Sequence, residues 1–138
     1  MKTMSLVLLM FFTLAGCAAG ITSNEIRLDA HYGPQPEFEA AQALATEVMQ
    51  GVLKDPYSAQ WSCKPTHQGQ LGDHAGFGLG TAMTGWILPC DINSKNSYGA
   101  YGGAEQYVFV IVDGVVGRAM HLGHTENGVP TERIIYNK

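Results

Sequence analysis

Residues 106–122, "QYVFVIVDGVVGRAMHL", decide the fold because they contain the clearest β-hairpin signal in the chain. Two β-branched runs flank Asp113-Gly114, which is a favoured two-residue hairpin turn. The first run, residues 107–112, is apolar at every position, so both of its faces should be buried. We therefore expect an antiparallel sheet in which residues 107–112 form the central strand.

Three further strands are expected around this hairpin. Residues 58–64, "SAQWSCK", and residues 85–92, "GWILPCDI", alternate in polarity with the period of two that is typical of a strand. Residues 134–136 form an apolar patch after a turn at Asn127-Gly128, and they indicate a final strand. Pro89 cannot donate a ladder hydrogen bond, so its strand should lie at an edge or carry a bulge.

One amphipathic helix is expected over residues 36–54, "PEFEAAQALATEVMQGVLK", where apolar side chains recur at intervals of three and four. Glu37 and Glu39 suit the first turn and Lys54 the last turn of a helix, because of the helix dipole. Pro56 disfavours helical backbone at the residue before it and should stop the helix. The sequence therefore predicts an α+β fold, with one N-terminal amphipathic helix packed on an antiparallel sheet of four to five strands.

The N-terminus has the organisation of a secretory signal. Residues 1–16 contain one lysine, then an apolar run, then small residues, and the apolar run is too short to span a membrane. Residues 14–17, "LAGC", resemble the lipobox of bacterial lipoproteins. That resemblance implies that Cys17 becomes the lipidated first residue of the mature chain. The alternative is ordinary secretory cleavage near Ala18 or Ala19.

The lipobox resemblance also implies a location. In Gram-negative lipoproteins of this type, Ala18 at the second mature position implies transport to the outer membrane, where more than one acyl chain gives stable anchoring. Residues 17–35 are polar and aperiodic, so we interpret them as the lipidated N-terminus and a flexible tether. Residues 36–138 then form a single α+β domain.

The charge balance argues against nucleic acid as a partner. The chain has 8 Lys and Arg against 12 Asp and Glu. Removing the signal removes Lys2 and leaves a net charge of about −5, with the basic residues scattered along the sequence. The expected contacts are the membrane, through the lipid anchor, and a protein of the cell envelope.

A disulfide between Cys63 and Cys90 is expected if Cys17 carries lipid, because an even pair then remains in an oxidising compartment. Antiparallel pairing of the two strands would bring these cysteines together, and strand periodicity places them on the same faces as Trp61 and Trp86. The alternative is a catalytic thiol that acts with a histidine, although neither cysteine has neighbours that would lower its pKa.

Neither the glycine-rich segment nor the histidines indicate a cofactor. Residues 69–85 lack the spacing of a phosphate-binding loop, so we expect a mobile connection. His121 and His124 form an H-x-x-H pair, with His67 and His74 as additional candidate ligands. A spacing of three on a strand points two rings apart, so we expect exposed histidines rather than a metal site. We assign no catalytic residue, metal or cofactor.

Residues 90–103, "CDINSKNSYGAYGG", are expected to connect a strand that ends near Ile92 to one that starts near Glu105. Asparagine, serine and glycine hold turns, but turn chemistry does not require two tyrosines. Tyrosines among such residues are typical of recognition surfaces. The candidate binding loop comprises Asn93, Lys95, Asn96, Tyr98 and Tyr101. The alternative is that both tyrosine rings fold back over the sheet and cover the core.

Two motifs carry a resemblance to a family. "LKDPYSAQW" at residues 53–61, followed by "CDINSKNSYGAYGG", resembles a pattern found in small exported bacterial proteins, L-x-D-P-x-S-A and then N-[AS]-K-N-S-Y-G-[GA]-Y. The matching parts cover about a fifth of the chain. That family has no established activity, so the resemblance implies domain identity without a function.

Three functions follow as hypotheses. The preferred one is a non-catalytic binding or scaffolding lipoprotein of the envelope, based on the anchor, the tether and the tyrosine loop. The second is an inhibitor of a basic hydrolase such as lysozyme, which an acidic chain would suit. The third is a periplasmic enzyme, which is disfavoured because no set of nucleophile, base and orienting residue is visible in the sequence.

Overall fold

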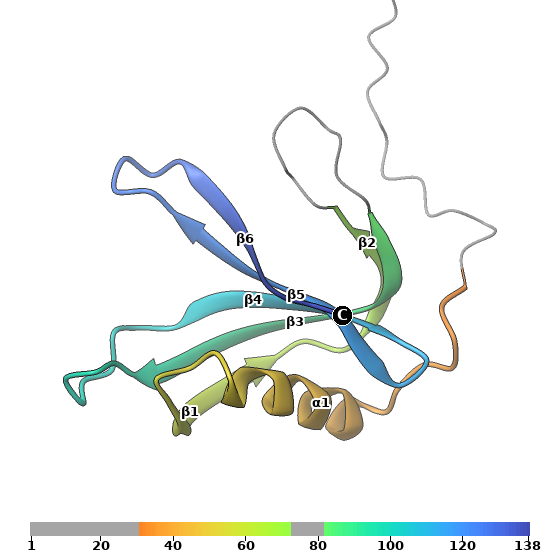
Figure 1. Ribbon diagram of the computed structural model, residues 1–138, viewed down its shortest axis with the longest axis horizontal. Coiled ribbons are helices and arrows are strands. Elements are labelled where there is room, and N and C mark those ends of the chain that lie inside the picture. The colour runs from red at the N-terminus through yellow and green to blue at the C-terminus, as the bar shows by residue number, and fades with distance from the viewer. Residues whose placement is uncertain (1–30, 73–81) are drawn as a thin grey trace, which may run out of the picture.

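The computed structural model describes residues 31–72 and 82–138 (Figure 1). It has an α+β fold, as predicted, with one helix packed on one antiparallel sheet. The elements in chain order are α1 Phe38–Gln50, β1 Asp55–Cys63, β2 His67–Leu71, β3 Met83–Lys95, β4 Glu105–Val112, β5 Val115–His124 and β6 Pro130–Asn137. The predicted signal, Cys17 and most of the predicted tether lie outside the described residues. Within the described ranges, no helix has the length and apolar character needed to cross a membrane.

The sheet is an antiparallel meander with the strand order β1-β3-β4-β5-β6. Strand β2 pairs with β3 on the same edge as β1, beside the N-terminal half of β3. The turn between β4 and β5 has φ of 50° at Asp113 and 74° at Gly114, which are the positive values that this type of hairpin turn requires. Strand β4 is central and buried on both faces, so the prediction from its apolar run is confirmed.

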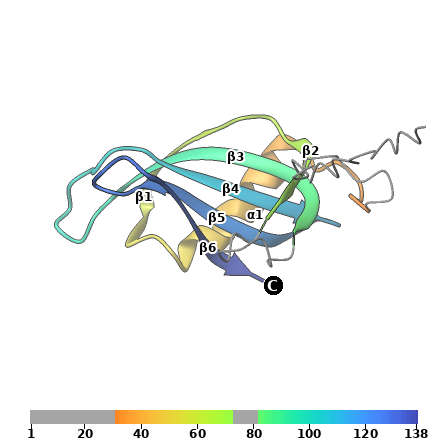
Figure 2. The same ribbon diagram turned by 90° about the horizontal axis from the view of Figure 1, so that it is seen from above.

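Helix α1 covers one face of the sheet, and in the view of Figure 2 it lies behind the strands. Ala41, Ala45 and Met49, at intervals of four, form its buried stripe. The helix runs from Phe38 to Gln50, so the predicted range of 36–54 was too long. Gly51 caps the C-terminal end of the helix, and its N–H donates to the carbonyl of Val48. Residues 52 and 53 follow outside the helix and still pack on the core, because burial of an apolar side chain does not require helical backbone.

Alternate residues of the central strands supply the two sides of the core. Leu88, Phe109 and Ile111 are fully buried on the side of the helix. Val110 is equally buried on the opposite side, in a smaller cluster with Ile87. This alternation follows from the period of two along β3 and β4. The helix therefore covers only one of the two apolar faces.

The glycine-rich segment is not a loop over its whole predicted length. Residues 69–71 belong to β2 and residues 83–85 to β3, with Gly69 and Gly85 directly paired, while residues 73–81 lie outside the described residues. A Cβ on Gly85 would lie 2.7 Å from the carbonyl oxygen of Ile111, and a Cβ on Gly69 would lie 2.8 Å from the side chain of Ile87. These glycines are required by close packing within the sheet, a role that composition cannot distinguish from that of a loop glycine.

Pro89 does not lie in an edge strand, because β3 has neighbours on both sides. The carbonyl of Pro89 accepts a hydrogen bond from the N–H of Lys64. Because the nitrogen and the carbonyl of one strand residue face the same side, the nitrogen of Pro89, which has no hydrogen to donate, faces the junction between β1 and β2. Three residues, 64–66, lie there opposite two, Leu88 and Pro89. The predicted edge position is therefore wrong, and instead of a bulge in β3 the pairing is interrupted at the junction between β1 and β2.

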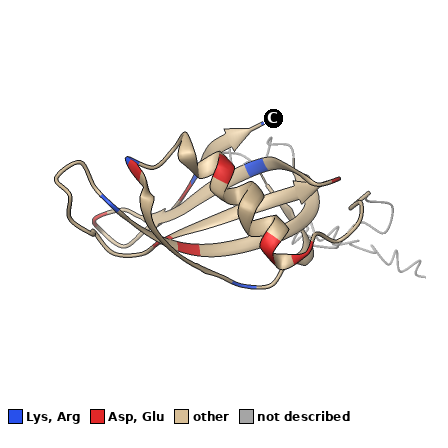
Figure 3. Ribbon diagram, turned by 90° about the horizontal axis from the view of Figure 1, so that it is seen from below, with Lys and Arg blue, Asp and Glu red and all other residues tan. Residues whose placement is uncertain are grey.

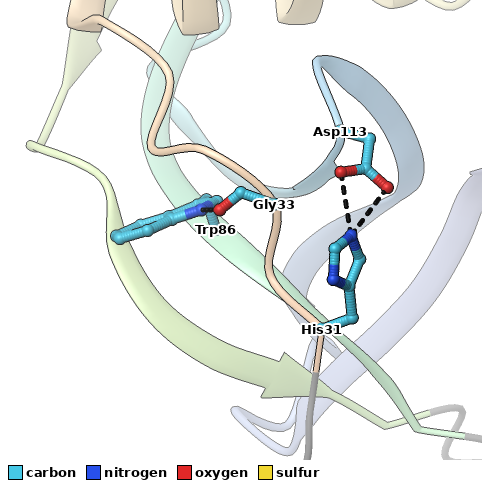
Figure 4. A network of polar contacts seen from close by, with 4 residues as sticks. All are labelled: His31, Gly33, Trp86 and Asp113. Atoms are coloured by element: carbon cyan, nitrogen blue, oxygen red, sulfur yellow. Dashed lines mark hydrogen bonds and ion pairs between the residues drawn. The ribbon is translucent and has the colours of Figure 1, made fainter.

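Residues before the helix are held against the domain at the end where β4 turns into β5 (Figure 4). Nε2 of His31 lies 3.0 Å from Oδ1 and 3.1 Å from Oδ2 of Asp113. The indole N–H of Trp86 donates to the carbonyl of Gly33 at 3.2 Å, and the ring of Tyr32 packs edge-on against Trp86. The last residues of the predicted tether thus contact the domain directly.

Candidate functional site

Residues 96–104 form the connection between β3 and β4, at one narrow end of the molecule (Figure 1). The connection is shorter than predicted, because β3 continues past Ile92 to Lys95. Oδ1 of Asn96 accepts hydrogen bonds from the N–H groups of Tyr98 and Ala100 at 2.9 and 3.2 Å. This is the local side-chain bonding by which asparagine holds a turn.

Two further contacts fix the ends of this loop. Oδ1 of Asn93 accepts a hydrogen bond from the N–H of Gly103 at 3.3 Å, and the N–H of Asn96 donates to the carbonyl of Ala100 at 2.9 Å. Gly99 and Gly103 have φ of 79° and 110°, and a residue with a side chain would be strained in either backbone conformation. Asn93 and Asn96 were predicted as binding residues, and the structure places their side-chain oxygens in contacts that shape the loop.

Tyr101 lies across the loop toward β1. Its hydroxyl donates to the carbonyl of Ser58 at 3.1 Å, and Nζ of Lys95 lies 5.6 Å from the centre of its ring. Such a cation–π contact at an exposed site contributes about 0.5–1 kcal/mol. Ser58 Oγ also accepts a hydrogen bond from the N–H of Lys95, so β1, β3 and the loop are joined at this point. The ring stays 44% exposed and does not cover the core.

Tyr98 and Tyr57 project into solvent, and each is 95% exposed. The structure therefore brings three tyrosines to one end of the sheet, which we call the tyrosine end: Tyr57 in β1, and Tyr98 and Tyr101 in the loop. Sequence reasoning missed Tyr57, because it precedes the alternating part of β1. Its position in the "DPYSA" motif was the only available signal.

No family model, curated protein or solved structure matches this chain. The role of the tyrosine end must therefore be inferred from its own geometry.

The disulfide joins Cys63 and Cys90, which face each other directly across the β1–β3 pair, as predicted. Cys90 is 2% exposed and belongs to the core cluster beneath α1, and the partly buried Cys63 packs against that cluster. Trp61 and Trp86 pack against the same cluster, with the ring of Trp61 centred 6.3 Å from that of Phe109. The bond has a position typical of a structural crosslink.

The histidines of the H-x-x-H pair separate, as a spacing of three on a strand requires. Nε2 of His121 lies 3.2 Å from Oε2 of Glu105, while His124 is exposed at the end of β5. His67 is exposed at the start of β2, and His74 lies outside the described residues. In residues 31–72 and 82–138, no three histidine, cysteine or carboxylate side chains gather in a way that would hold a metal ion.

Glu105 also accepts a hydrogen bond from the hydroxyl of Tyr107 at 2.8 Å. Burial raises the pKa of Tyr107 well above its usual value, and the Glu105 carboxylate raises it further by hydrogen bonding and by charge, while Arg133 acts in the opposite direction. The phenol of Tyr107 is therefore held in its neutral form and is a hydrogen-bond donor. The ring of His121 packs beside it, 5.0 Å between centres.

Proposed function

We propose that this protein is a small envelope lipoprotein that acts as a non-catalytic binding or scaffolding component, and that a protein partner docks on its tyrosine end. In this proposal Cys17 carries the lipid, the outer membrane is the location, and the domain from residue 31 onward presents the docking surface. The inhibitor of a basic hydrolase and the periplasmic enzyme remain as alternatives for experiment to separate.

The observation that carries the proposal is the exposure of two tyrosines, Tyr57 and Tyr98, each at 95%. A tyrosine ring supplies a large contact area with few rotatable bonds, which is why tyrosine is enriched in protein interfaces. The backbone that carries them is ordered before any partner binds, because Tyr57 lies in β1 and the Asn96 side chain and the Tyr101 to Ser58 hydrogen bond hold the loop. A loop that is already ordered loses less conformational entropy on binding.

The path of the chain supports an outward-facing docking surface. Residue 31 contacts the β4–β5 turn, at the end of the molecule opposite the 96–104 loop (Figure 1). An anchor N-terminal to residue 31 would therefore join the domain at the end far from the tyrosines. The tyrosine end would then point away from the membrane to which the lipid is attached.

Site-specific photo-crosslinking in bacterial cells tests the docking surface. The full chain carries benzoylphenylalanine at Tyr98, and the matched control carries it at Val115, a partly exposed residue (39%) at the other end of the sheet. We expect a discrete crosslinked species from position 98 only, with an envelope protein as the partner. Equal crosslinking from both positions, or none from position 98, would refute docking at the tyrosine end. A basic hydrolase as the crosslinked protein would favour the inhibitor alternative.

The lipid anchor has a separate test. The intact mass of the mature protein should correspond to a chain that begins at Cys17 and carries acyl groups. The Cys17→Ser chain should lack that mass and leave the membrane fraction. An unmodified N-terminus at Ala19 or Gly20 would refute the lipoprotein assignment without affecting the docking surface.

A further inference from the structure

A hollow of about 260 Å³ opens beside the 96–104 loop, where the segment after α1 meets β3, β4 and β6. Its floor includes Ile92 and Tyr107, which are 2% and 6% exposed. Gly102 and Gly103 bring loop backbone to its wall. The volume lies below the range of pockets for drug-sized ligands, so the hollow suits a single side chain or the end of a peptide chain.

Basic side chains gather around this hollow although the chain as a whole is acidic. Lys54 follows α1, Lys95 ends β3 and Arg133 lies in β6, and all three line the hollow. They are half of the six basic residues in the described part of the chain, the others being Lys64, Arg118 and Lys138. In Figure 3, acidic positions lie along α1, and both basic and acidic positions occur toward the end of the molecule with the loop. The fold thus brings together three basic residues that lie far apart in the sequence.

Among the described residues, no carboxylate forms an ion pair within 4.0 Å with any of these three cations. Glu105 is the single carboxylate that lines the hollow. Its oxygen is already held by the Tyr107 hydroxyl at 2.8 Å and by His121 at 3.2 Å. An incoming anion would therefore find cationic donors and the loop backbone, and it would offset part of the positive charge of the site.

We propose that this hollow binds a carboxylate of an acidic peptide segment in the partner, either an Asp or Glu side chain or a C-terminus. This inference rests on the proposed function, because it specifies the chemistry of the partner that docks at the tyrosine end. Tyr101 connects the two features, since its ring lies beside Nζ of Lys95, which lines the hollow. A peptide crossing the loop would contact tyrosine rings and place its carboxylate among Lys54, Lys95 and Arg133.

A peptide fits this site better than an anionic lipid headgroup. The hollow lies at the end of the domain away from residue 31, where the chain comes in from its N-terminus (Figure 1). A headgroup of the membrane that holds the anchor would more easily meet the opposite end. The flanking tyrosines also favour a polypeptide, because rigid aromatic rings and ordered polar loops are the composition of protein recognition surfaces.

The test is fluorescence anisotropy of a labelled oligoglutamate peptide of roughly eight residues with the full chain. Lys54→Gln, Lys95→Gln and Arg133→Gln should each weaken binding by roughly fivefold, the upper range for one exposed charge pair. The matched control is Lys64→Gln, which removes a basic residue outside the hollow and should leave affinity unchanged. A labelled oligolysine peptide of the same length should not bind. Circular dichroism of each variant confirms that it is folded.

Three results would overturn the inference. Equal loss in Lys64→Gln would mean that affinity reflects overall charge. Saturable binding to phosphatidylglycerol vesicles that Arg133→Gln abolishes, without binding of oligoglutamate, would assign the hollow to lipid headgroups. Displacement of the peptide by inorganic phosphate at equal concentration would mean a site for small anions.

The same variants separate this inference from the proposed function. If position 98 still crosslinks its partner in a chain that carries Lys95→Gln and Arg133→Gln, docking at the tyrosine end stands and the carboxylate site is refuted. If oligoglutamate binds and responds to the variants but no partner crosslinks in cells, the carboxylate site stands and the envelope docking function is refuted.

Discussion

The Cys63–Cys90 disulfide provides the sharpest test of the structural reasoning. We predict that replacing both cysteines by alanine leaves the protein folded but lowers its free energy of unfolding substantially. Alanine is the better replacement, because Cys90 is 2% exposed and serine would bury a hydroxyl without an assured partner. The two residues already face each other in the β1–β3 register, so the strands remain paired without the bond.

The expected loss follows from the length of chain that the bond closes. Cys63 and Cys90 are separated by 27 positions in the sequence. The chain-entropy relation gives about 12 cal/mol/K for a loop of that length, which is about 3.5 kcal/mol near room temperature. For a domain of this size, that loss corresponds to a fall in melting temperature of roughly 15 °C.

Urea denaturation, followed by tryptophan fluorescence, measures this loss, because Trp61 and Trp86 pack on the same core cluster as the bond. The wild-type chain in strong reductant is the matched control, since it lacks the same crosslink. Both samples should give the same free energy of unfolding.

Two outcomes would refute the structural assignment of the bond. A loss below about 1 kcal/mol would mean that the crosslink does not constrain the unfolded chain as reasoned. Rapid thiol labelling of Cys63 and Cys90 in the folded, unreduced protein would mean that they are not bonded, and the catalytic-thiol alternative would have to be reopened.

Three further predictions concern glycine, tyrosine and asparagine positions. Gly85→Ala should lower the free energy of unfolding by about 3 kcal/mol or prevent folding, because the new Cβ would lie 2.7 Å from a backbone oxygen. Gly102→Ala should leave stability unchanged in the same thermal melting experiment, because nothing lies within 4 Å of its Cβ position. Because its pKa is raised, Tyr107 keeps its proton in the folded state at a pH where the unfolded state has lost it. The free energy of unfolding should therefore fall as pH rises above about 10, and it should fall less in Tyr107→Phe, as urea titrations across that pH range would show. Asn96→Ala should speed amide hydrogen exchange in the 96–104 loop with little effect on melting temperature, whereas the control Ser97→Ala should change neither. Equal exchange rates in the two variants would contradict the role of the Asn96 side chain in holding the loop.

The sequence drew attention to only some of the residues that the structure gathers at the tyrosine end. The surplus of tyrosines among turn residues drew attention to the 96–104 loop, because turn chemistry does not require those rings, and the structure leaves both of them exposed. Composition did not reveal that the side-chain oxygens of Asn93 and Asn96 shape the loop, since a side chain that shapes a loop and one that binds a partner look alike in sequence. Tyr57 and the basic hollow were missed because they depend on which strands become neighbours.

The sequence by itself determined the elements whose signals are local. The Asp113-Gly114 turn, the apolar run of β4 and the helical spacing of Ala41, Ala45 and Met49 each express a backbone geometry within a few residues. The tertiary structure alone decided what lies beside these elements. It placed β2 on the edge of β3, put the break in pairing opposite Pro89, and gathered Lys54, Lys95 and Arg133 around one hollow. Those outcomes depend on register between distant strands, which is set by packing of the whole sheet and leaves no periodic signal in any single segment.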